Sequence, residues 1–325
     1  MSPTGRGAQR ISIPTGSGWG IVLAVGAALI SGLAVYLNAF AVKQLPDAAV
    51  YTTLKNGVAA AILVIGAVAL GGRQDLRAMD RRRWTSVLVV AIVGGSVPFV
   101  LFFTGLAAAS APSAAFIQKT LFVWVALLAV PFLGETLGFA TLAALFVMVM
   151  GQALVLPPQG IVWGRGETLI LAATVLWALE TILARRLLAS LPGHVLGALR
   201  MGLGLVILIG YLLVADKIEA VGRLSAAQWA WAILTGTILA GYVATWYGAL
   251  KRAPASVVTS VLVLGAVVTG GLTTLTGANA PSPAVITGYL LIVAAAVLII
   301  LLSRSAARTV ASASLEMEPA DARPG

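Results

Sequence analysis

The chain has 325 residues, of which 60% are hydrophobic and 10% charged, and its mean hydropathy is +1.01. Because a typical soluble domain has about 25% charged residues, the composition excludes a soluble domain and indicates a membrane protein. There is no cysteine, which excludes disulfides and thiolate metal sites. The net charge of +10 does not indicate nucleic-acid binding, because the basic residues flank apolar segments and there set membrane topology.

Ten apolar segments follow one another, each near the roughly 20 residues that a spanning helix needs. They are continuous runs, which excludes the alternating pattern of a β-barrel. Polar ends, residues 1–17 and 304–325, are expected to be disordered tails. The predicted fold class is therefore an all-α polytopic membrane protein. The expected spans are residues 19–41, 48–70, 86–107, 111–132, 136–156, 167–187, 194–214, 228–249, 254–274 and 282–303.

The chain also repeats itself. From Leu54 it reads Leu-Lys-Asn-Gly, and 145 residues later, from Leu199, it reads Leu-Arg-Met-Gly. Residues 84–134 carry Lys119 as their one charge, and residues 253–303, a stretch of equal length, carry none. Such duplication in a membrane chain is typical of a transporter with two related halves. The predicted halves are residues 18–156 and 157–303, and since each has five spans, the second must enter the bilayer inverted.

The basic residues predict the orientation of the chain. With both termini in the cytoplasm, 14 of the 21 Lys and Arg lie in inner segments, 4 in outer loops and 3 within spans. A bias of this kind sets the orientation of membrane proteins. The sequence therefore predicts a multi-pass protein of the cell (inner) membrane with both termini cytoplasmic.

Two stretches carry a family pattern. The first runs from Gly105-Leu106 to Ala114-Ala115 and on to Pro131-Phe132-Leu133-Gly134-Glu135, and the second from Gly248-Ala249-Leu250 through Ala253-Pro254-Ala255-Ser256 to Gly277. Over about residues 19–303 the chain resembles the EamA-like proteins of the drug/metabolite transporter superfamily. It departs from their pattern where Gly134-Glu135 becomes Gly277-Ala278 in the second half. The resemblance implies ten helices in two inverted repeats. It also implies secondary transport of small metabolites, often outward, by alternating access around a cavity lined largely by helices 1, 3, 4, 6, 8 and 9.

Four charged residues lie inside predicted spans and away from the span ends, where a charge costs at least about 2.5–3.5 kcal/mol at the helix centre and by default indicates function. Lys119, which shares a helix face with Phe116, is the candidate anchor for a carboxylate or phosphate; the alternative is a lysine that snorkels outward. Lys55 and Arg200 hold the same position in the two halves and are expected to be structural. Glu180 is the candidate coupling group, because a buried carboxyl can take up and release a proton. Its alternative is an ion pair with Arg200 or with the arginines that follow it.

Aromatic residues on helices 1, 3, 6 and 8 complete the predicted substrate site; the alternative for each is packing or contact with lipid. They are Tyr36, Phe99, Trp177, Tyr242 and Trp246. Two further residues are hinge candidates: Pro98 should kink the third span and free a carbonyl, and Gly241 lies at the corresponding place in the eighth. Glu135 is expected in the first turn of the fifth helix, where its charge suits the helix dipole.

The chain has no phosphate-binding loop of the nucleotide-hydrolysing kind, so ATP cannot drive it directly. One histidine, no cysteine and one deep acid leave no catalytic or metal-binding constellation. The predicted function is a secondary active transporter, without a cofactor, that exports small amphipathic metabolites such as amino acids. Alternatives are an exchanger for anionic or phosphorylated metabolites anchored by Lys119, a channel, and a membrane-embedded enzyme. The expected partners are a small solute and the lipid bilayer, with no nucleic acid. Proton coupling, and the choice between monomer and homodimer, stay open.

Overall fold

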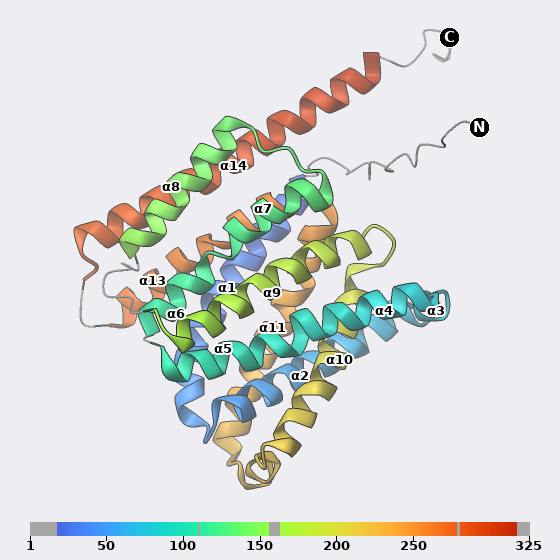
Figure 1. Cartoon of the computed structure of the whole chain (residues 1–325), viewed down its shortest axis with the longest axis vertical. Coiled ribbons are helices and arrows are strands. Elements are labelled where there is room, and N and C mark those ends of the chain that lie inside the picture. Colours follow the sequence, from blue (N-terminus) through green and yellow to red (C-terminus); the bar gives the residue numbers. More distant parts are fainter. Residues whose placement is uncertain (1–17, 110, 156–162, 278–279, 317–325) are drawn as a thin grey trace.

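A computed structural model of the chain describes residues 18–109, 111–155, 163–277 and 280–316, and every regular element in them is helical (Figure 1). The first half contains α1 (Gly18–Gln44), α2 (Ala48–Ala69), α3 (Gly72–Arg77), α4 (Arg81–Val90), the π-helix η1 (Ala91–Ser96), α5 (Val97–Ala108), α6 (Ala111–Lys119), α7 (Leu121–Leu133) and α8 (Phe139–Val155). The second half contains α9 (Arg165–Leu187), α10 (Gly193–Val214), the 3₁₀ helix η2 (Ile218–Arg223), α11 (Ala226–Arg252), α12 (Ala255–Leu262), α13 (Leu264–Thr276) and α14 (Pro283–Glu316).

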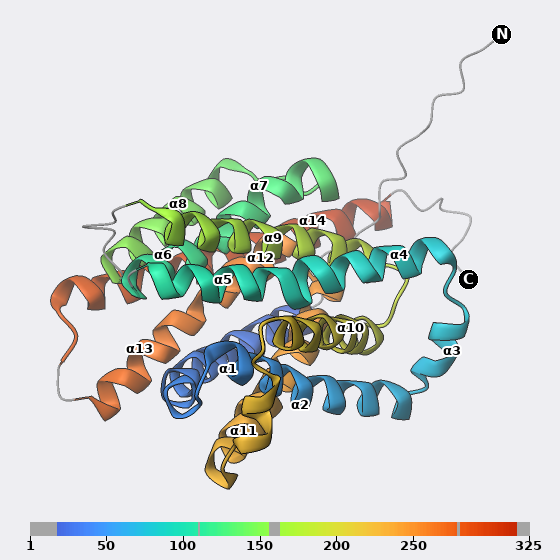
Figure 2. The same ribbon diagram turned by 60° about the horizontal axis from the view of Figure 1, so that its bottom comes forward.

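Nine helical segments within these described ranges are long and apolar enough to cross a membrane, and in three of them consecutive helices join end to end (Arg81–Phe102, Ser113–Leu133 and Ala255–Thr276). The tenth, α8, has 17 residues, which at 1.5 Å per residue gives about 25 Å. Successive segments alternate in direction, so the loops gather at two opposite faces (Figure 2). We call the face where α1 begins and α14 ends the termini face, and the opposite one the far face.

The two halves contact one another as a two-fold axis requires. Helix α1 packs along α11 as α9 packs along α5, while α2 pairs with its own counterpart α10 and α8 with its counterpart α14. Since each half crosses an odd number of times, α9 begins on the far face although α1 begins on the termini face. The predicted class, ten spanning helices in two inverted five-helix repeats, is confirmed.

The same symmetry appears at two places where helices cross with their backbones in close contact. A Cβ on Gly95 would lie 2.7 Å from the carbonyl oxygen of Arg200, and one on Gly236 would lie 2.8 Å from that of Lys55. Glycine is needed at both places because any side chain would collide with the facing backbone. Lys55 and Arg200 hold the same position in the two halves, so the two crossings are equivalent.

Two spans that the sequence predicts as single helices, 111–132 and 254–274, are interrupted. A tight turn at Thr120 separates α6 from α7, and one at Val263 separates α12 from α13. At each break the backbone N–H donates three residues back rather than four, from Thr120 to Ile117 at 3.1 Å and from Val263 to Ser260 at 3.1 Å. A local 3₁₀ turn of this kind is a common weak point in a helix.

Other boundaries differ from expectation for local reasons. The third span begins at Arg81 rather than 86, because Asp80 caps α4 by accepting from the N–H of Arg83 at 2.9 Å. Helix α14 continues to Glu316, into the segment predicted as a disordered tail, because residues 304–316 are rich in alanine and contain neither Gly nor Pro. The predicted tail residues 1–17 and 317–325 lie outside the described residues.

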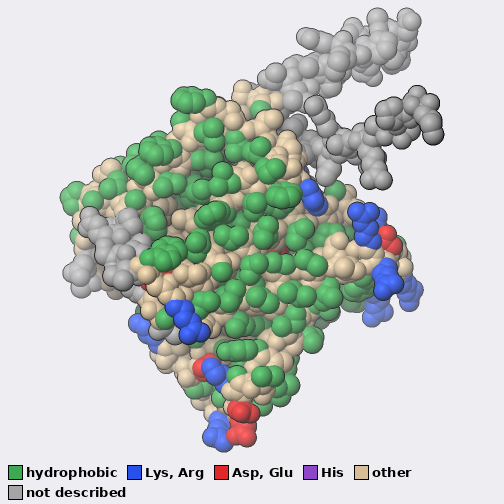
Figure 3. Space-filling model, in the orientation of Figure 1, with side chains coloured by type: hydrophobic (Ala, Val, Ile, Leu, Met, Phe, Trp, Pro, Cys, Tyr) green, Lys and Arg blue, Asp and Glu red, His purple; other side chains and the backbone are tan. Residues whose placement is uncertain are grey.

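The visible surface fits a bilayer environment. Hydrophobic side chains cover the middle of the face in Figure 3, while Lys and Arg gather at the ends of the molecule, one group lying at the end formed by α3 and α4. A belt of this kind is what membrane-spanning helices present to lipid.

Candidate substrate cavity

A cavity of about 250 Å³ lies between the two repeats. Its walls come from α1, α5, α6, α7, α9, α11 and α12, and in addition from α10 through Arg200. The cavity is bounded toward the termini face by α7 packed on α12. Within the described residues, α6 and α13, the far-side halves of the same two spans, make no contact of comparable extent. The cavity therefore belongs to the far-side half of the bundle.

Five of the seven predicted substrate-binding residues line this cavity: Lys119, Phe99, Trp177, Tyr242 and Trp246. The other two do not. The hydroxyl of Tyr36 donates to Oγ1 of Thr276 at 2.9 Å, which directs its ring to the end of α13. Phe116 lies one turn before Lys119 on α6 and is not part of the wall. The residues of α6 that line the cavity are Gln118 and Lys119.

Lys119 stands at the last position of α6, where the helix breaks. No hydrogen bond or ion pair of its side chain is present among the described residues. The turn after it is fixed by Thr120, whose hydroxyl donates to Ile117 O at 2.6 Å and accepts from Nε1 of Trp124 at 3.1 Å. The break therefore places at the cavity a lysine that has no partner within the described part of the chain.

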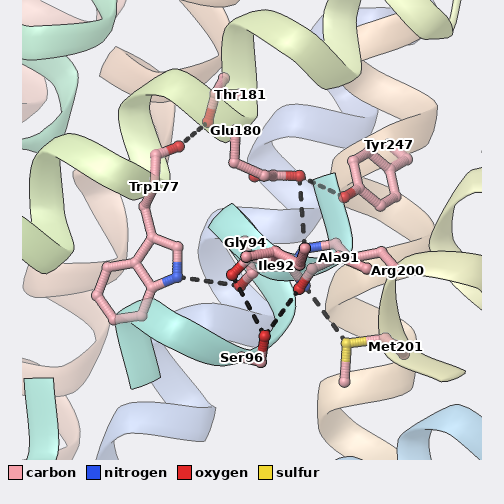
Figure 4. Close-up of polar contacts among 10 residues, drawn as sticks. All are labelled: Ala91, Ile92, Gly94, Ser96, Trp177, Glu180, Thr181, Arg200, Met201 and Tyr247. Carbon is pink, nitrogen blue, oxygen red and sulfur yellow. Dashed lines mark hydrogen bonds and ion pairs between the residues drawn. The ribbon is translucent and has the colours of Figure 1, made fainter. Parts of the chain in front are cut away.

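Glu180 and Arg200 form the second charged group of the wall (Figure 4). Arg200 Nε lies 3.4 Å from Glu180 Oε1, and the hydroxyl of Tyr247 donates to the same oxygen at 2.5 Å. Glu180 is 3% exposed. The ion pair that the sequence left as an alternative for Glu180 is thus present, and this part of the wall carries no net charge.

The π-helix η1 supplies the partner that completes the group. Pro98 has no N–H to donate to the carbonyl of Gly94, four residues earlier. That carbonyl instead accepts from Arg200 Nη2 at 2.9 Å and from Trp177 Nε1 at 3.2 Å (Figure 4). The ring of Trp177 then packs edge-on against Phe99, with centroids 5.4 Å apart. Proline and π-helix together orient one aromatic wall of the cavity.

The hinge candidates differ from each other in structure. Pro98 is the second residue of α5, which begins where the π-helix η1 ends, whereas α11 runs unbroken through Gly241. A Cβ on Gly241 would meet only Cδ1 of Ile30, at 3.9 Å. A hinge role for either residue stays a prediction.

Lys55, the counterpart of Arg200, lies away from the cavity. Its Nζ stands 5.1 Å from the ring centroid of Tyr51, and its side chain is buried without an acidic partner among the described residues. The ring faces of aromatic residues attract cations. Nearby, the side-chain amide of Asn56 and the hydroxyl of Thr52 are buried and have no hydrogen-bond partner among the described residues.

Glu135 lies elsewhere than the sequence predicts. Helix α8 begins only at Phe139, because Gly134 adopts φ +69° at the end of α7 and turns the chain. The carboxylate of Glu135 accepts from the N–H of Ala255 at 2.6 Å, and from the N–H of Ser256 at 3.2 Å and its hydroxyl. Glu135 therefore caps α12 of the other repeat, not its own helix α8.

Several lining residues were missed from the sequence: Ser31, Asn38, Gln118, Thr181 and Thr259. All are small or neutral and polar, and such side chains recur in membrane helices without a cost that would single them out. The one available signal was the position of Gln118 beside Lys119. No group of three or more metal-ligating side chains is found among the described residues.

A second cavity of about 210 Å³ lies at the far face between α2, α5 and α10, and shares Phe99 with the first. At its rim Lys217 Nζ donates to Asp47 at 2.7 Å. Burial opposes ionisation of Asp47, but hydrogen bonds from Lys217 and from the N–H groups of Ala49 and Val50 outweigh it and hold the pKa of Asp47 below its usual 3.8. The same hydrogen bond raises the pKa of Lys217.

An inverted-repeat bundle of ten spanning helices around a cavity defines a class of protein, the multi-pass membrane transporters. The sequence model of the EamA-like transporter family matches residues 18–156 and again residues 164–301. The chain belongs to the EamA-like transporter family and is a membrane transporter of small molecules.

Comparison with solved structures agrees with this fold. One of them, described only as the crystal structure of a protein, covers 89% of this chain and 99% of its own, with a TM-score of 0.74 and 18% sequence identity. At that identity the likeness shows the fold alone. No curated protein matches the sequence.

Proposed function

We propose that the protein is a secondary active transporter that exports small amphipathic metabolites, such as amino acids, by alternating access around the cavity. The observation that supports this most is the position of Lys119. It is a cation without a partner among the described residues, and it lines the same cavity as the rings of Trp177, Tyr242 and Trp246. An amphipathic solute has a charged end and an apolar body, and this wall offers a surface for each.

The charged group that fits is an anionic one. A carboxylate beside Lys119 would gain a charge-assisted hydrogen bond in a site shielded from water. Glu180 is already bound by Arg200 and Tyr247, so the ammonium group of an amino acid would find neutral acceptors, Asn38 and Gln118, rather than a free carboxylate.

The same unpaired charge favours a second candidate, exchange of anionic or phosphorylated metabolites. A phosphate has more charge than one lysine can balance, and Arg200 is committed to Glu180. Lys119 is then the one lining cation without a partner among the described residues, so we place the singly charged carboxylate first and the phosphorylated solute second.

The location and direction belong to the same proposal. The termini face carries the ends of α7, α9 and α11 with Arg185, Arg186 and Lys251, and basic residues favour the cytoplasmic side. We therefore assign the termini face to the cytoplasm of a cell (inner) membrane, with both termini inside. The cavity then belongs to the outward half. Glu180 is the candidate for proton coupling, which would supply the driving force.

The experiment uses proteoliposomes loaded with zwitterionic amino acids, monocarboxylates or sugar phosphates, and compares wild type with Lys119→Ala. Loss of one charge-assisted contact, about 1.5–3 kcal/mol, should weaken binding of carboxylate solutes about 10- to 100-fold. The matched control is Lys55→Ala, a buried lysine outside the cavity, which should leave solute affinity unchanged.

Selective loss of sugar-phosphate transport in Lys119→Ala would replace the first candidate with the second. Unchanged transport of every solute would remove Lys119 from the site and with it the main support for the proposal.

A further inference from the structure

At the termini face, hydrogen bonds from one repeat to the other hold the helices together, and three of them are accepted by Glu135. Its carboxylate accepts three hydrogen bonds from the first turn of α12, at Ala255 and Ser256. It is 7% exposed. Hydrogen bonds to an ionised carboxylate are roughly twice as strong as neutral ones, and the N-terminus of a helix favours a negative charge.

Basic residues from the second repeat complete this closure. Arg186 Nε donates to the carbonyl of Phe132 on α7 at 3.1 Å. Arg185 is buried, interacts electrostatically with Glu135 and donates to the carbonyl of Lys251 at 3.2 Å. The ends of α7, α9 and α11 and the start of α12 are thereby held together by charged side chains.

Among the described residues, the far face does not repeat these charged contacts. The helix ends at Gly134 and Gly277 correspond, so Ala278 takes the sequence position of Glu135. Gly20 of α1 lies against Arg252, and its counterpart Gly166 of α9 lies against Ala108, so Arg252 and Ala108 hold equivalent positions in the two repeats. Lys251, one residue before Arg252, therefore corresponds to Ala107.

The same register pairs Arg185 and Arg186 with Ala39 and Phe40. In place of the Arg186 contact, α1 and α13 share two neutral hydrogen bonds among the described residues. The hydroxyl of Tyr36 donates to Oγ1 of Thr276 at 2.9 Å, and the hydroxyl of Thr269 donates to the carbonyl of Gly32 at 2.8 Å. The far face does have an ion pair, between Asp47 before α2 and Lys217 after α10. It joins the ends of α2 and α10, however, and not α6 to α13.

We propose that Glu135 latches the cavity shut toward the termini face by capping α12 across the repeat boundary. Because the described residues of the far face include no acid that caps a helix across the repeat boundary in this way, we infer that the resting transporter is open toward the far face. Opening toward the termini face requires α12 to leave Glu135. The latch also reaches the cavity, since Thr259, which lines it, donates to the carbonyl of Ala255 at 2.9 Å. Glu135 is thus a positioning residue for the transport cycle, not a substrate ligand.

The test measures distances between paired spin labels in lipid nanodiscs, and the natural absence of cysteine lets pairs be introduced directly. Exposed positions suit the labels. The pair Thr136→Cys and Arg252→Cys spans the termini face, and the pair Ala108→Cys and Leu275→Cys spans the mouth at the far face. In Glu135→Gln, the termini-face pair should gain a longer distance population while the far-face pair gains a shorter one.

Ser256→Ala removes the hydroxyl partner but keeps both N–H donors, so it should shift the populations in the same direction and by less. Glu167→Gln is the matched control. Glu167 is also buried, at 5% exposed, but it caps its own helix through the N–H of Gly164 at 3.1 Å. It should move neither distance.

Unchanged distances in folded Glu135→Gln would overturn the latch, and an equal shift in Glu167→Gln would do the same by exposing general loosening. If Glu135→Gln does not fold, Ser256→Ala decides: no shift there overturns the inference. The inference rests on the proposed alternating access, but the measurement needs no solute, so an error in the substrate class would leave its result intact.

Discussion

Arg200 and Lys55 hold the same position in two copies of one scaffold, yet their surroundings share little. Each places its backbone carbonyl against a glycine of the third span in the opposite repeat. The side chain of Arg200 then meets Glu180 and the carbonyl of Gly94, whereas that of Lys55 lies on the ring of Tyr51.

The difference teaches that duplication fixed the backbone and left the chemistry to diverge. Helix crossings depend on glycine and repeat in both halves. Polar groups arise from single side chains, and here the second half holds Glu180 and Arg200 while the first half holds Lys119 and Glu135. These groups lack two-fold symmetry, as does the amphipathic solute that we propose for the cavity.

The largest expected effect comes from breaking the ion pair. Glu180→Gln leaves Arg200 buried without a counter-charge, which should cost about 3–5 kcal/mol of unfolding free energy. Lys55→Met, at the matching position, should change stability by less than about 1 kcal/mol, because no acid loses a partner and a methionine fills similar space. Thermal unfolding of the purified variants measures both, and equal losses would contradict the asymmetry.

The same Glu180→Gln protein tests proton coupling. If Glu180 carries the proton, transport in the variant should lose the pH dependence that wild type has. Transport with an unaltered pH profile would leave Glu180 as a partner of Arg200 only.

An intermediate effect should be shared by the two halves. Gly95→Ala and Gly236→Ala each force a Cβ to within 2.7 Å and 2.8 Å of a facing carbonyl, and overpacking of this kind costs about 1–3 kcal/mol. Gly241→Ala is the control, since its Cβ would meet nothing closer than 3.9 Å. Unfolding midpoints that fall for one crossing and not the other would show that the two are not equivalent.

The smallest effect concerns Asp47. Asn caps a helix about as well as Asp, so Asp47→Asn isolates the pair with the partly exposed Lys217, worth at most about 1 kcal/mol. Because the pKa of Asp47 is lowered below 3.8, the contribution is present at neutral pH and is lost as pH falls through that lowered value. Unfolding midpoints of wild type and variant should therefore differ at pH 7, and the difference should shrink as the pH is lowered below 3.8. A difference that does not shrink in that acid range would contradict the assignment.

Much of the architecture was readable from the sequence, and part of the site as well. The apolar runs gave the spans, and the shared position of Lys55 and Arg200 gave the duplication. The hydropathy of a span does not reveal a break such as that at Thr120, because a 3₁₀ turn changes the hydrogen bonding without changing composition. Tyr36 and Phe116 do not line the cavity, and the sequence could not indicate this because an aromatic residue on a spanning helix fits lipid, a neighbouring helix or a cavity equally well.

The sequence by itself determined the fold class, because in a bilayer only helices and closed barrels satisfy the backbone, and uninterrupted apolar runs select helices. It could not determine which polar groups meet. These helices are apolar on nearly every side, so their pattern does not state which face turns inward. Only the tertiary structure, by fixing the rotation and crossing of each helix, placed Glu180 beside Arg200, left Lys119 without a partner among the described residues, and directed Glu135 to α12.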